Sequence, residues 1–409
     1  MRSICLVVVL TLIAGVARAG PLTFDAAERL ARETAPSLEA QALDIRAAHA
    51  AAISAGRLPD PKLGLAVEGF PVSGPTAARP DLNDFSDVRV GLSQDFPNLA
   101  KRRAARARAS ADIDVAQSGQ TVEARAVAVS TALAWVDLYY AERRLKALDD
   151  IDRAIAPIRT SAPARLASGS QRPAQSLEAE QLSAALDDQR SGLMAEVGKA
   201  RAELVRWTGD PTVEVSGAPP DYPIDATSLR AGLDRLPALA SFDALDAQAD
   251  ADLAAARAEK RPDLGLEVGY QHRDPRFGDL LMTGVTISLP IFGGTRQDPM
   301  IAARAQTANR VRAQREATRR DLAAQLDADL ADHTMHHDRL ARAATTLVPL
   351  ALKRAELERA SYAAGAASLS DVLDAVLALA QARLDVIERE AVATRDSVRI
   401  ALTYGSQGQ

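Results

Sequence analysis

Internal duplication constrains the fold of this chain more than any other feature of its sequence. The segment Pro61–Val67 returns in similar form as Pro262–Val268. Gly169 in the first copy and Gly365 in the second each precede a short Leu-acidic-Ala sequence. Both copies follow the order helix, strand pair, very long helix, glycine turn and helix. Duplication on this scale predicts two equivalent supersecondary units.

The first residues have the pattern of a secretory signal peptide. A basic start is followed by Ile4–Val16, an apolar run too short to span a bilayer, and by Ala17–Ala19, which fits a cleavage site. We therefore expect a signal peptide at 1–19. The one cysteine, Cys5, falls inside it, which predicts a mature chain without disulfides, thiol chemistry or a cysteine metal site.

The remaining sequence is predicted to divide into a first repeat at 20–208, a Pro-rich linker at 209–225 and a second repeat at 226–409. A net charge of -5 with both signs interspersed argues against a nucleic-acid partner. Aromatic residues make up only 4% while alanine is abundant, which is typical of long, closely packed helices. No later apolar segment is long enough for a membrane helix, so we expect any membrane crossing to use strands.

Helical periodicity covers most of each copy. We expect an Ala-rich helix over 24–54, with Thr23 as its cap. Very long helices are expected over 97–165 and 296–363, each on the order of 100 Å at 1.5 Å per residue, followed by return helices of roughly half that length. The last return helix carries one apolar stripe: Leu369, Val372, Leu373, Val376, Ala380, Leu384, Ile387, Ala391, Thr394 and Val398.

Each copy also contains two segments with the alternation of β-strands. Their apolar phase comprises Leu63, Leu65, Val67, Val88, Val90, Leu92, Leu264, Leu266, Val268, Tyr270, Leu281, Val285, Ile287 and Leu289. Polar or small residues fill the other phase, and Phe70, Phe85, Phe96 and Phe292 stand at or near the strand ends. Strands of roughly ten residues with this pattern match a transmembrane β-barrel, and an ordinary half-buried hairpin is the alternative.

Four strands are too few to close a barrel. Open edges in a bilayer would leave backbone N–H and C=O groups unpaired, which lipid does not tolerate. The sequence therefore predicts that several chains close one barrel together, and three copies would supply about twelve strands. The attached helices favour the barrel, because they are too long and too Ala-rich to bury a lone hairpin.

Over nearly all of its mature length the chain resembles the TolC outer-membrane efflux channel family. The resemblance rests on the duplicated plan, on the strand entry Arg57–Pro61 with its echo Lys260–Asp263, and on the turn Tyr362–Gly365 that leads to Asp371–Ala375. It implies a mainly α fold with a membrane β-barrel: a homotrimer with an outer-membrane barrel of about twelve strands and a long periplasmic α-barrel. It also implies partners, namely outer-membrane lipid, a periplasmic membrane-fusion adaptor and an inner-membrane RND-type pump.

The resemblance assigns the pore entrance as well. Acidic side chains after the second tip turn form a ring in the family, and Asp371 and Asp374 match them, so three chains would make two cation-attracting rings. Tyr362 matches a tyrosine that helps to hold the entrance closed. A basic residue of that closing network is Ala367 here, which weakens the expected gate. Solvated surface charges near a helix cap are the alternative for both aspartates.

Two further features concern partners and cargo. The turns at Gly169 and Gly365 are expected to form the adaptor-docking tips, because they are the two reversals farthest from the strands. Glycine at each turn permits a tight reversal with φ > 0. His333 and His337 are candidate metal ligands at a spacing of four, with a polar helix face as the alternative. Two segments, Pro59–Pro61 with Leu63–Phe70 and Ser93–Pro97, resemble the CzcC-like metal-efflux branch more than the multidrug branch.

These observations predict a passive outer-membrane channel of a tripartite efflux system that exports metal cations or small toxic compounds. No catalytic or cofactor-binding motif is present, so we expect neither enzymatic activity nor a cofactor. A periplasmic adaptor, with one helical hairpin and compact β domains, is the first alternative. A structural coiled-coil protein of the envelope is the second.

Overall fold

Two compact units make up the chain, and their segments interleave along the sequence. The computed structural model describes residues 21–75, 77, 86–167 and 173–405. The predicted signal peptide, Phe85 and Gly169 lie outside these residues. Unit 1 is drawn from Met1–Ala35, Ala126–Ile224 and Asp329–Thr403, and unit 2 from Pro36–Arg125, Asp225–Ala328 and Tyr404–Gln409. Each unit therefore contains segments of both sequence repeats.

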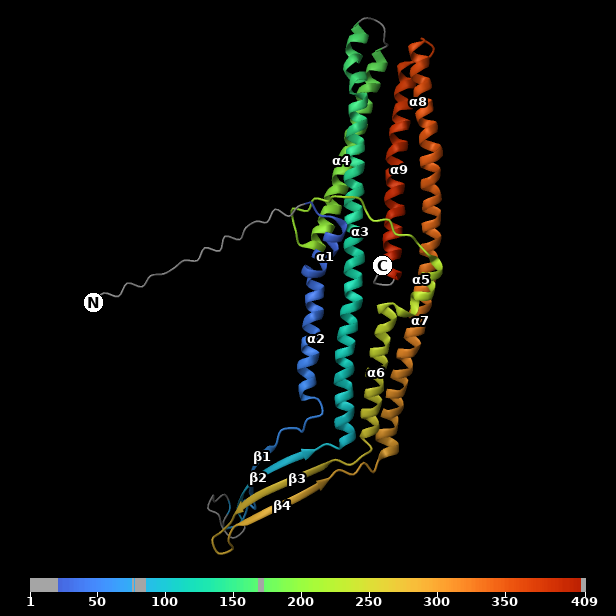
Figure 1. Cartoon of the computed structure of the whole chain (residues 1–409). Coiled ribbons are helices and arrows are strands. Elements are labelled where there is room, and N and C mark those ends of the chain that lie inside the picture. The colour runs from blue at the N-terminus through green and yellow to red at the C-terminus, as the bar shows by residue number, and fades with distance from the viewer. Residues whose placement is uncertain (1–20, 76, 78–85, 168–172, 406–409) are drawn as a thin grey trace, which may run out of the picture. The chain divides into compact units, whose positions relative to one another are not determined.

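Helices form most of the described chain (Figure 1). They are α1 (Phe24–Thr34), α2 (Pro36–Ser54), α3 (Leu99–Ala167), α4 (Pro173–Thr208), α5 (Ala226–Gly232), the 3-10 helix η1 (Leu233–Arg235), α6 (Pro237–Ala258), α7 (Gly293–Arg342), the π-helix η2 (Ala343–Leu347), α8 (Val348–Ala363) and α9 (Leu369–Tyr404). The predicted long helix of the first copy is confirmed as α3, with 69 residues, and its return helix α4 has 36. Among the described helices, none combines the length and the apolar character needed to cross a membrane.

Proline causes both departures from the predicted helices. The single helix expected at the start of the first copy is two helices, because Ala35 precedes Pro36 and has extended backbone with a ψ of 120°. The second long helix is interrupted by η2, directly before α8. Pro349 has no N–H, so the α-helical hydrogen-bond pattern is broken at this position. Directly before it, the Val348 N–H donates to the Ala343 carbonyl five residues back, which is the π-helical bond of η2.

The core of unit 1 packs α3 against α1, α4 and α9. Trp135 on α3 is fully buried and meets Phe24 of α1 edge-on, with 5.5 Å between the ring centroids. Its indole N–H donates to the Leu22 carbonyl at 2.9 Å, and Leu22 also forms a β-bridge with Val215 in the predicted linker. The apolar stripe predicted on α9 supplies buried residues to this cluster and to a second one in the same unit, which confirms it.

Unit 2 contains one antiparallel sheet with the strand order β1-β2-β3-β4 (Figure 1). The strands are β1 (Lys62–Glu68), β2 (Asp87–Phe96), β3 (Leu264–His272) and β4 (Leu280–Ile287). All four predicted strands are present, although Leu289 lies beyond the end of β4. The β2–β3 pairing joins the two sequence repeats, in a register that runs from Val88 opposite His272 to Phe96 opposite Leu264.

The two faces of this sheet differ as the alternation predicted. The register places Leu65, Val90, Tyr270 and Leu281 in one row across the four strands, on a single face. That face is apolar and exposed: Leu65 and Leu281 each expose 74% of their surface. An exposed apolar surface of this extent marks contact with lipid or another chain.

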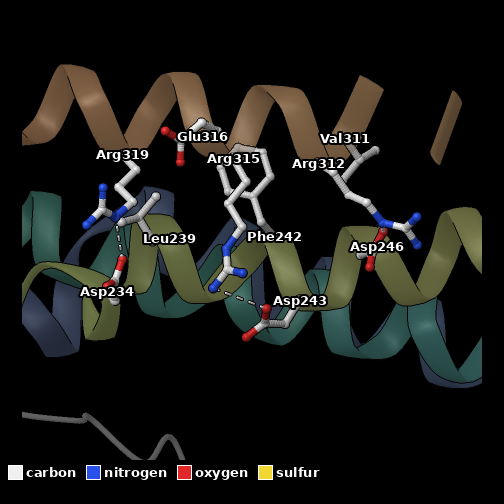
Figure 2. Close-up of a pocket in the computed structure, with 10 residues that line it drawn as sticks. All are labelled: Asp234, Leu239, Phe242, Asp243, Asp246, Val311, Arg312, Arg315, Glu316 and Arg319. Carbon is white, nitrogen blue, oxygen red and sulfur yellow. Dashed lines mark hydrogen bonds and ion pairs between the residues drawn. The ribbon is translucent and has the colours of Figure 1, made fainter. Parts of the chain in front are cut away.

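In unit 2, α6 and α7 lie side by side, and a series of ion pairs joins α7 to α6 and to the preceding η1 (Figure 2). The pairs are Arg312–Asp246 at 3.0 Å, Arg315–Asp243 at 3.6 Å and Arg319–Asp234 at 3.0 Å. They line a cavity of about 660 Å³ that also contacts Leu239, Phe242 and Val311. Because each of these arginines has an acidic partner, the cavity wall offers paired charges. Exposed pairs of this kind stabilise a fold by up to about 1 kcal/mol each.

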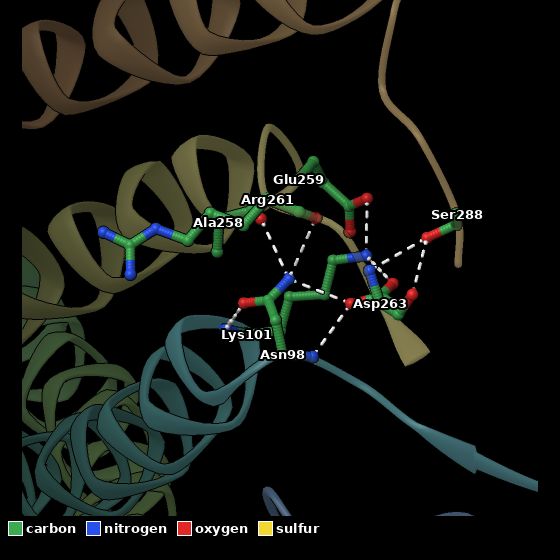
Figure 3. Close-up of polar contacts among 7 residues, drawn as sticks. All are labelled: Asn98, Lys101, Ala258, Glu259, Arg261, Asp263 and Ser288. Atoms are coloured by element: carbon green, nitrogen blue, oxygen red, sulfur yellow. Dashed lines mark hydrogen bonds and ion pairs between the residues drawn. The ribbon is translucent and has the colours of Figure 1, made fainter. Parts of the chain in front are cut away.

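A polar cluster in unit 2 ties the end of β2 to the start of β3 (Figure 3). One oxygen of Asp263 accepts hydrogen bonds from the Asn98 backbone N–H at 2.8 Å and from the Asn98 side-chain amide at 2.9 Å. The other oxygen accepts from Lys101 Nζ at 2.6 Å, and the Asp263 N–H donates to Ser288 Oγ at 2.9 Å. Asn98 also caps α3, since its Oδ1 accepts from the Lys101 N–H at 3.0 Å. Asp263 thus connects the β2–α3 junction, at Asn98 and Lys101, with Ser288 just after β4.

Aspartate on the apolar face tests whether that face contacts lipid. Leu65→Asp or Val268→Asp places a charge where the native side chains are 74% and 50% exposed and apolar. We expect a cost of roughly 2 kcal/mol near the bilayer midplane. The matched controls are Gly64→Asp and Gly265→Asp on the polar face of the same strands. The readout is the yield of folded protein in the outer-membrane fraction, and equal losses on the two faces would contradict the assignment of the lipid face.

Neutralising Asp263 should destabilise the protein in a pH-dependent way. Partial burial raises the carboxyl pKa, but the hydrogen bonds from Lys101 and Asn98 outweigh it, so the pKa of Asp263 lies below its ordinary value of 3.8. The stabilisation is therefore complete above that value and is lost as the pH falls through the folded-state pKa. Asp263→Asn should cost about 2 kcal/mol at neutral pH.

Thermal unfolding in detergent at several pH values measures this effect. The gap between Asp263→Asn and the parent should narrow as the pH falls below the ordinary pKa of the carboxyl. Asp60→Asn, at the exposed entry to β1, is the control and should change little. A gap independent of pH would refute the role of the Asp263 charge.

Candidate functional site

The reversal between α8 and α9 in unit 1 carries most of the predicted site residues. Gly365 has a φ of 78°, in the left-handed region that glycine adopts without strain. Its N–H donates to the Tyr362 carbonyl at 3.0 Å, and the Ala366 N–H donates to the Ser361 carbonyl at 2.8 Å. These two bonds form a Schellman motif, which ends α8 and satisfies its last carbonyls. A side chain at Gly365 would meet open space, so conformation alone restricts this position.

A capping box starts the next helix. Ser368 and Asp371 satisfy each other: the Asp371 carboxylate accepts from the Ser368 N–H at 2.8 Å and from its hydroxyl at 2.7 Å. In return, the Asp371 N–H donates to Ser368 Oγ at 3.2 Å. The Ser368 hydroxyl, followed by the Ser368 N–H, lowers the pKa of Asp371. Asp371 is therefore ionised at neutral pH and begins α9 with a negative charge, where the helix dipole favours it.

Asp371 and Asp374 share one exposed face of α9. They are three residues apart, and both are exposed, while the residues between and after them are buried. The buried neighbours are Val372, Leu373, Ala375 and Val376. In the single chain the two carboxylates therefore point away from the packed side of the helix, as a pore-lining pair requires.

Tyr362 lies against a buried cluster of unit 1. The cluster contains Leu148 from α3, Leu186 from α4 and Val376 from α9, and the half-buried Tyr362 of α8 packs on it. The aromatic ring thus connects the end of α8 to the other long helices of the unit. The structure brings Tyr362, Gly365, Asp371 and Asp374 together around one turn, whereas Gly169 lies outside the described residues.

The histidine pair occupies a different part of unit 1, on α7. The rings of His333 and His337 have centroids 4.3 Å apart, and His333 Nε2 is 3.1 Å from Ser397 Oγ. Burial, followed by the charge of His337, lowers the pKa of His333. A zinc site uses at least three protein ligands. Within the described residues, no group of three or more His, Cys, Asp and Glu side chains is placed to hold a metal ion.

Two contacts in unit 1 were not predicted from the sequence, although the first of them has a recognisable pattern. The Ser368 cap was visible as a Ser-x-x-acidic pattern ahead of an apolar run, which is a recognised helix start. Another is the contact of His336 Nδ1 with the buried Asp396 at 2.6 Å, across α7 and α9. No local signal identifies such a pair, because its members are far apart in sequence.

The second repeat matches a known family model. Residues 229–406 match the model described as outer membrane efflux protein. This segment contains β3, β4, the α8–α9 turn, Asp371 and Asp374. No curated protein matches the sequence.

Solved structures share the fold over nearly the whole chain. A CusC structure matches with a TM-score of 0.76 and 16% identity, covering 94% of this chain and 92% of that chain. The Campylobacter jejuni CmeC outer membrane channel matches with a TM-score of 0.77 and 14% identity, covering 94% and 87%. The Vibrio cholerae outer membrane protein VceC matches with a TM-score of 0.74 and 19% identity, covering 94% and 97%. The predicted mainly α fold, with long helices attached to a four-stranded sheet, is therefore confirmed for the single chain.

A β-branched residue at Gly365 should unfold the turn locally. Gly365→Val forces a bulky residue into the left-handed region, which costs on the order of 1–3 kcal/mol. Hydrogen exchange of the backbone amides around the turn should accelerate accordingly. Gly192→Val is the matched control, because a side chain at Gly192 on α4 also meets open space but needs no positive φ. Equal protection of the turn in both variants would exclude the conformational role of Gly365.

Proposed function

We infer that this chain, whose residues 229–406 match the outer membrane efflux protein model, is the outer-membrane channel of a tripartite efflux system. The observation that carries this function is the sheet of unit 2, with one exposed apolar face and one polar face. A face of each kind is what a strand segment needs to separate lipid from an aqueous duct. The channel is passive and not an enzyme.

We propose that three copies form the channel. In the described chain, β1 and β4 each pair with a neighbouring strand on one side only. All pairings are antiparallel, so β4 of one copy runs antiparallel to β1 of the next. Joining these edges satisfies their backbone groups, and three copies close a barrel of about twelve strands.

The α8–α9 turn is proposed as part of the surface that docks a periplasmic adaptor, which connects the channel to an inner-membrane pump of the RND type. Its rigid reversal at Gly365 and the packing of Tyr362 support a defined shape at this end of unit 1. The Gly169 turn is proposed as the second tip by its equivalent place in the first repeat. Tyr362 would then influence closure, because it connects α8 to the cluster that holds the other long helices.

The cargo proposed for this duct is metal cations or small toxic compounds. Asp371 and Asp374 supply exposed negative charge at the start of α9, which favours cations. His333 and His337 add two imidazoles. A metal cation bound there would need water molecules as its remaining ligands. Energy for transport comes from the pump, since the channel itself carries out no chemistry.

Disulfide crosslinking tests the assembly directly. The one cysteine of the chain, Cys5, lies in the predicted signal peptide, so a mature protein without cysteine is the expected background. Leu65→Cys on β1 is combined in turn with Thr283→Cys, Val285→Cys or Ile287→Cys on β4. Within one chain these strands are three spacings apart, about 14 Å, whereas a disulfide requires Cα atoms within about 7 Å. Any disulfide therefore joins two copies.

We expect at least one pair to give covalent dimers and trimers, with no species larger than the trimer. Val90→Cys with Tyr270→Cys, which lie opposite each other on β2 and β3, is the intrachain control and should leave monomers. Monomers alone in all three β1–β4 combinations, or a ladder beyond three, would refute the trimer.

Replacing both entrance aspartates should lower cation selectivity. In a trimer, Asp371 and Asp374 supply six carboxylates, and Asp371→Asn with Asp374→Asn removes them. Single-channel recording should show a smaller preference for cations and weaker block by polyvalent cations. The difference should fade toward molar salt, where the screening length is about 3 Å. Unchanged selectivity at low salt would return both residues to the role of surface charges beside the helix cap.

A further inference from the structure

Charged residues of the four strands are confined to one face of the sheet. Six residues with ionised side chains occur in β1–β4, and the register places them all on the polar face: Lys62, Glu68, Asp87, Arg89, Asp95 and Glu267. The five strand glycines share the same face: Gly64, Gly91, Gly265, Gly269 and Gly284. The polar face therefore combines charge with unusually little side-chain bulk.

Arg89 is the centre of this charged face. It lies on β2, and one guanidinium nitrogen is 3.1 Å from Glu68 on β1 while another is 2.5 Å from Glu267 on β3. The Arg89 side chain is only 26% exposed, compared with 47% for Glu68 and 43% for Glu267. The guanidinium therefore bridges three strands along the sheet instead of projecting from it.

Glycine makes this flat arrangement possible. A Cβ atom at Gly269 would lie 3.4 Å from Arg89 Nε, and one at Gly91 would lie 3.5 Å from Glu267 Oε1. The two charged side chains thus occupy the space that larger residues would fill. At Gly64, in the same row of the sheet, the nearest atom to a Cβ is the Gly91 carbonyl oxygen at 3.9 Å. Gly64 therefore provides a control position on the same face.

The charges on this face do not cancel. Lys62 and Arg89 are cationic, while Glu68, Asp87, Asp95 and Glu267 are anionic, so two minus four gives a net charge of -2 for the strands of one chain. Lys62 pairs with Asp95 at 2.8 Å. Asp87 accepts from the neutral Gln271 at 2.5 Å, so its charge has no cationic partner in that contact. Arg89 is then the group whose charge most directly offsets the acidic side chains in the middle of the sheet.

We propose that Arg89, held flat over Gly269 and between Glu68 and Glu267, sets the charge selectivity of the strand-lined part of the duct. The proposal rests on the proposed function, in which the polar face lines the passage of a trimer. Paired in this way, Arg89 moderates a cation-selective surface without narrowing the opening. Ions passing the sheet meet a ring of three such clusters, separate from the carboxylates at the start of α9.

Reversal potentials of single channels under a KCl gradient test the proposal. The channels carry Asp371→Asn and Asp374→Asn, so the entrance carboxylates do not mask the effect, and the unmodified protein is measured in parallel. Arg89→Gln should raise the cation-to-anion permeability ratio about twofold, because one charge per chain disappears at close range. Glu68→Gln with Glu267→Gln should lower the ratio by at least as much. Arg89→Lys keeps the charge and should leave the ratio near its starting value.

Glycine variants test the geometry independently of any change in charge. Gly269→Val should displace the Arg89 side chain from Glu267 into the passage and lower both the conductance and the cation preference. Gly64→Val adds the same bulk to the same face without meeting Arg89, so it should leave the cation preference intact. Valine is well accepted in strands, which favours folding of both variants.

The outcomes separate this proposal from the function on which it rests. If Arg89→Gln and the double Gln variant both form conducting trimers with the same reversal potential as the parent channel, the role of Arg89 is overturned. The proposed function would stand. Equal selectivity changes in Gly269→Val and Gly64→Val would overturn the flat geometry. Failure of the parent protein to form crosslinked trimers or conducting channels would instead overturn the proposed function.

Discussion

Pairing of β2 with β3 is the interaction on which the rest of the architecture depends. Among the described strands it is the pairing that joins the two sequence repeats, and it aligns residues as distant in sequence as Val88 and His272. Without it the chain would hold two separate hairpins, each too small for independent stability. Asp263 and Asn98 reinforce this pairing at its base, where strand becomes helix. The same pairing leaves β1 and β4 as the two edges of the sheet, the strands at which the proposed trimer would join its copies.

Periodicity predicted the elements because it depends on one face of each being buried or lipid-facing. The strand alternation and the stripe on α9 were both confirmed for this reason. The predicted helices ran without a break through Pro36 and Pro349. The structure interrupts a helix beside each of these prolines, so their positions in the sequence indicated both breaks. The Asp263 cluster is different in kind. Its partners come from segments that only the folded chain brings together, so no local pattern identifies them.

The predicted entrance residues illustrate the same division. The Gly365 turn and the Ser368–Asp371 cap are local, and their sequence patterns predict their geometry. Asp374 shares the exposed face with Asp371 because α9 buries its opposite side. Whether those carboxylates line a pore depends on other copies of the chain, which the sequence of one chain describes only through family resemblance. The pairing of Arg89 with two glutamates was equally hidden, since it needs the register of three strands.

Ion pairs between α6 and α7 act on alignment more than on stability. Both helices are rich in alanine, and a smooth alanine surface distinguishes poorly between one helical turn and the next. The pairs Arg312–Asp246 and Arg319–Asp234 lie about two turns apart along α7, at 3.6 residues per turn. A slip by one turn would exchange partners within the series, but at one end an aspartate would then face alanine, Ala308 or Ala323, and lose its pair. Contributions of up to about 1 kcal/mol each then add to a preference for one alignment. Because α6 leads into β3 and α7 follows β4, a fixed alignment of these helices also fixes where the two strands begin and end. The ion pairs contribute to that alignment although the apolar contacts of the helices are small.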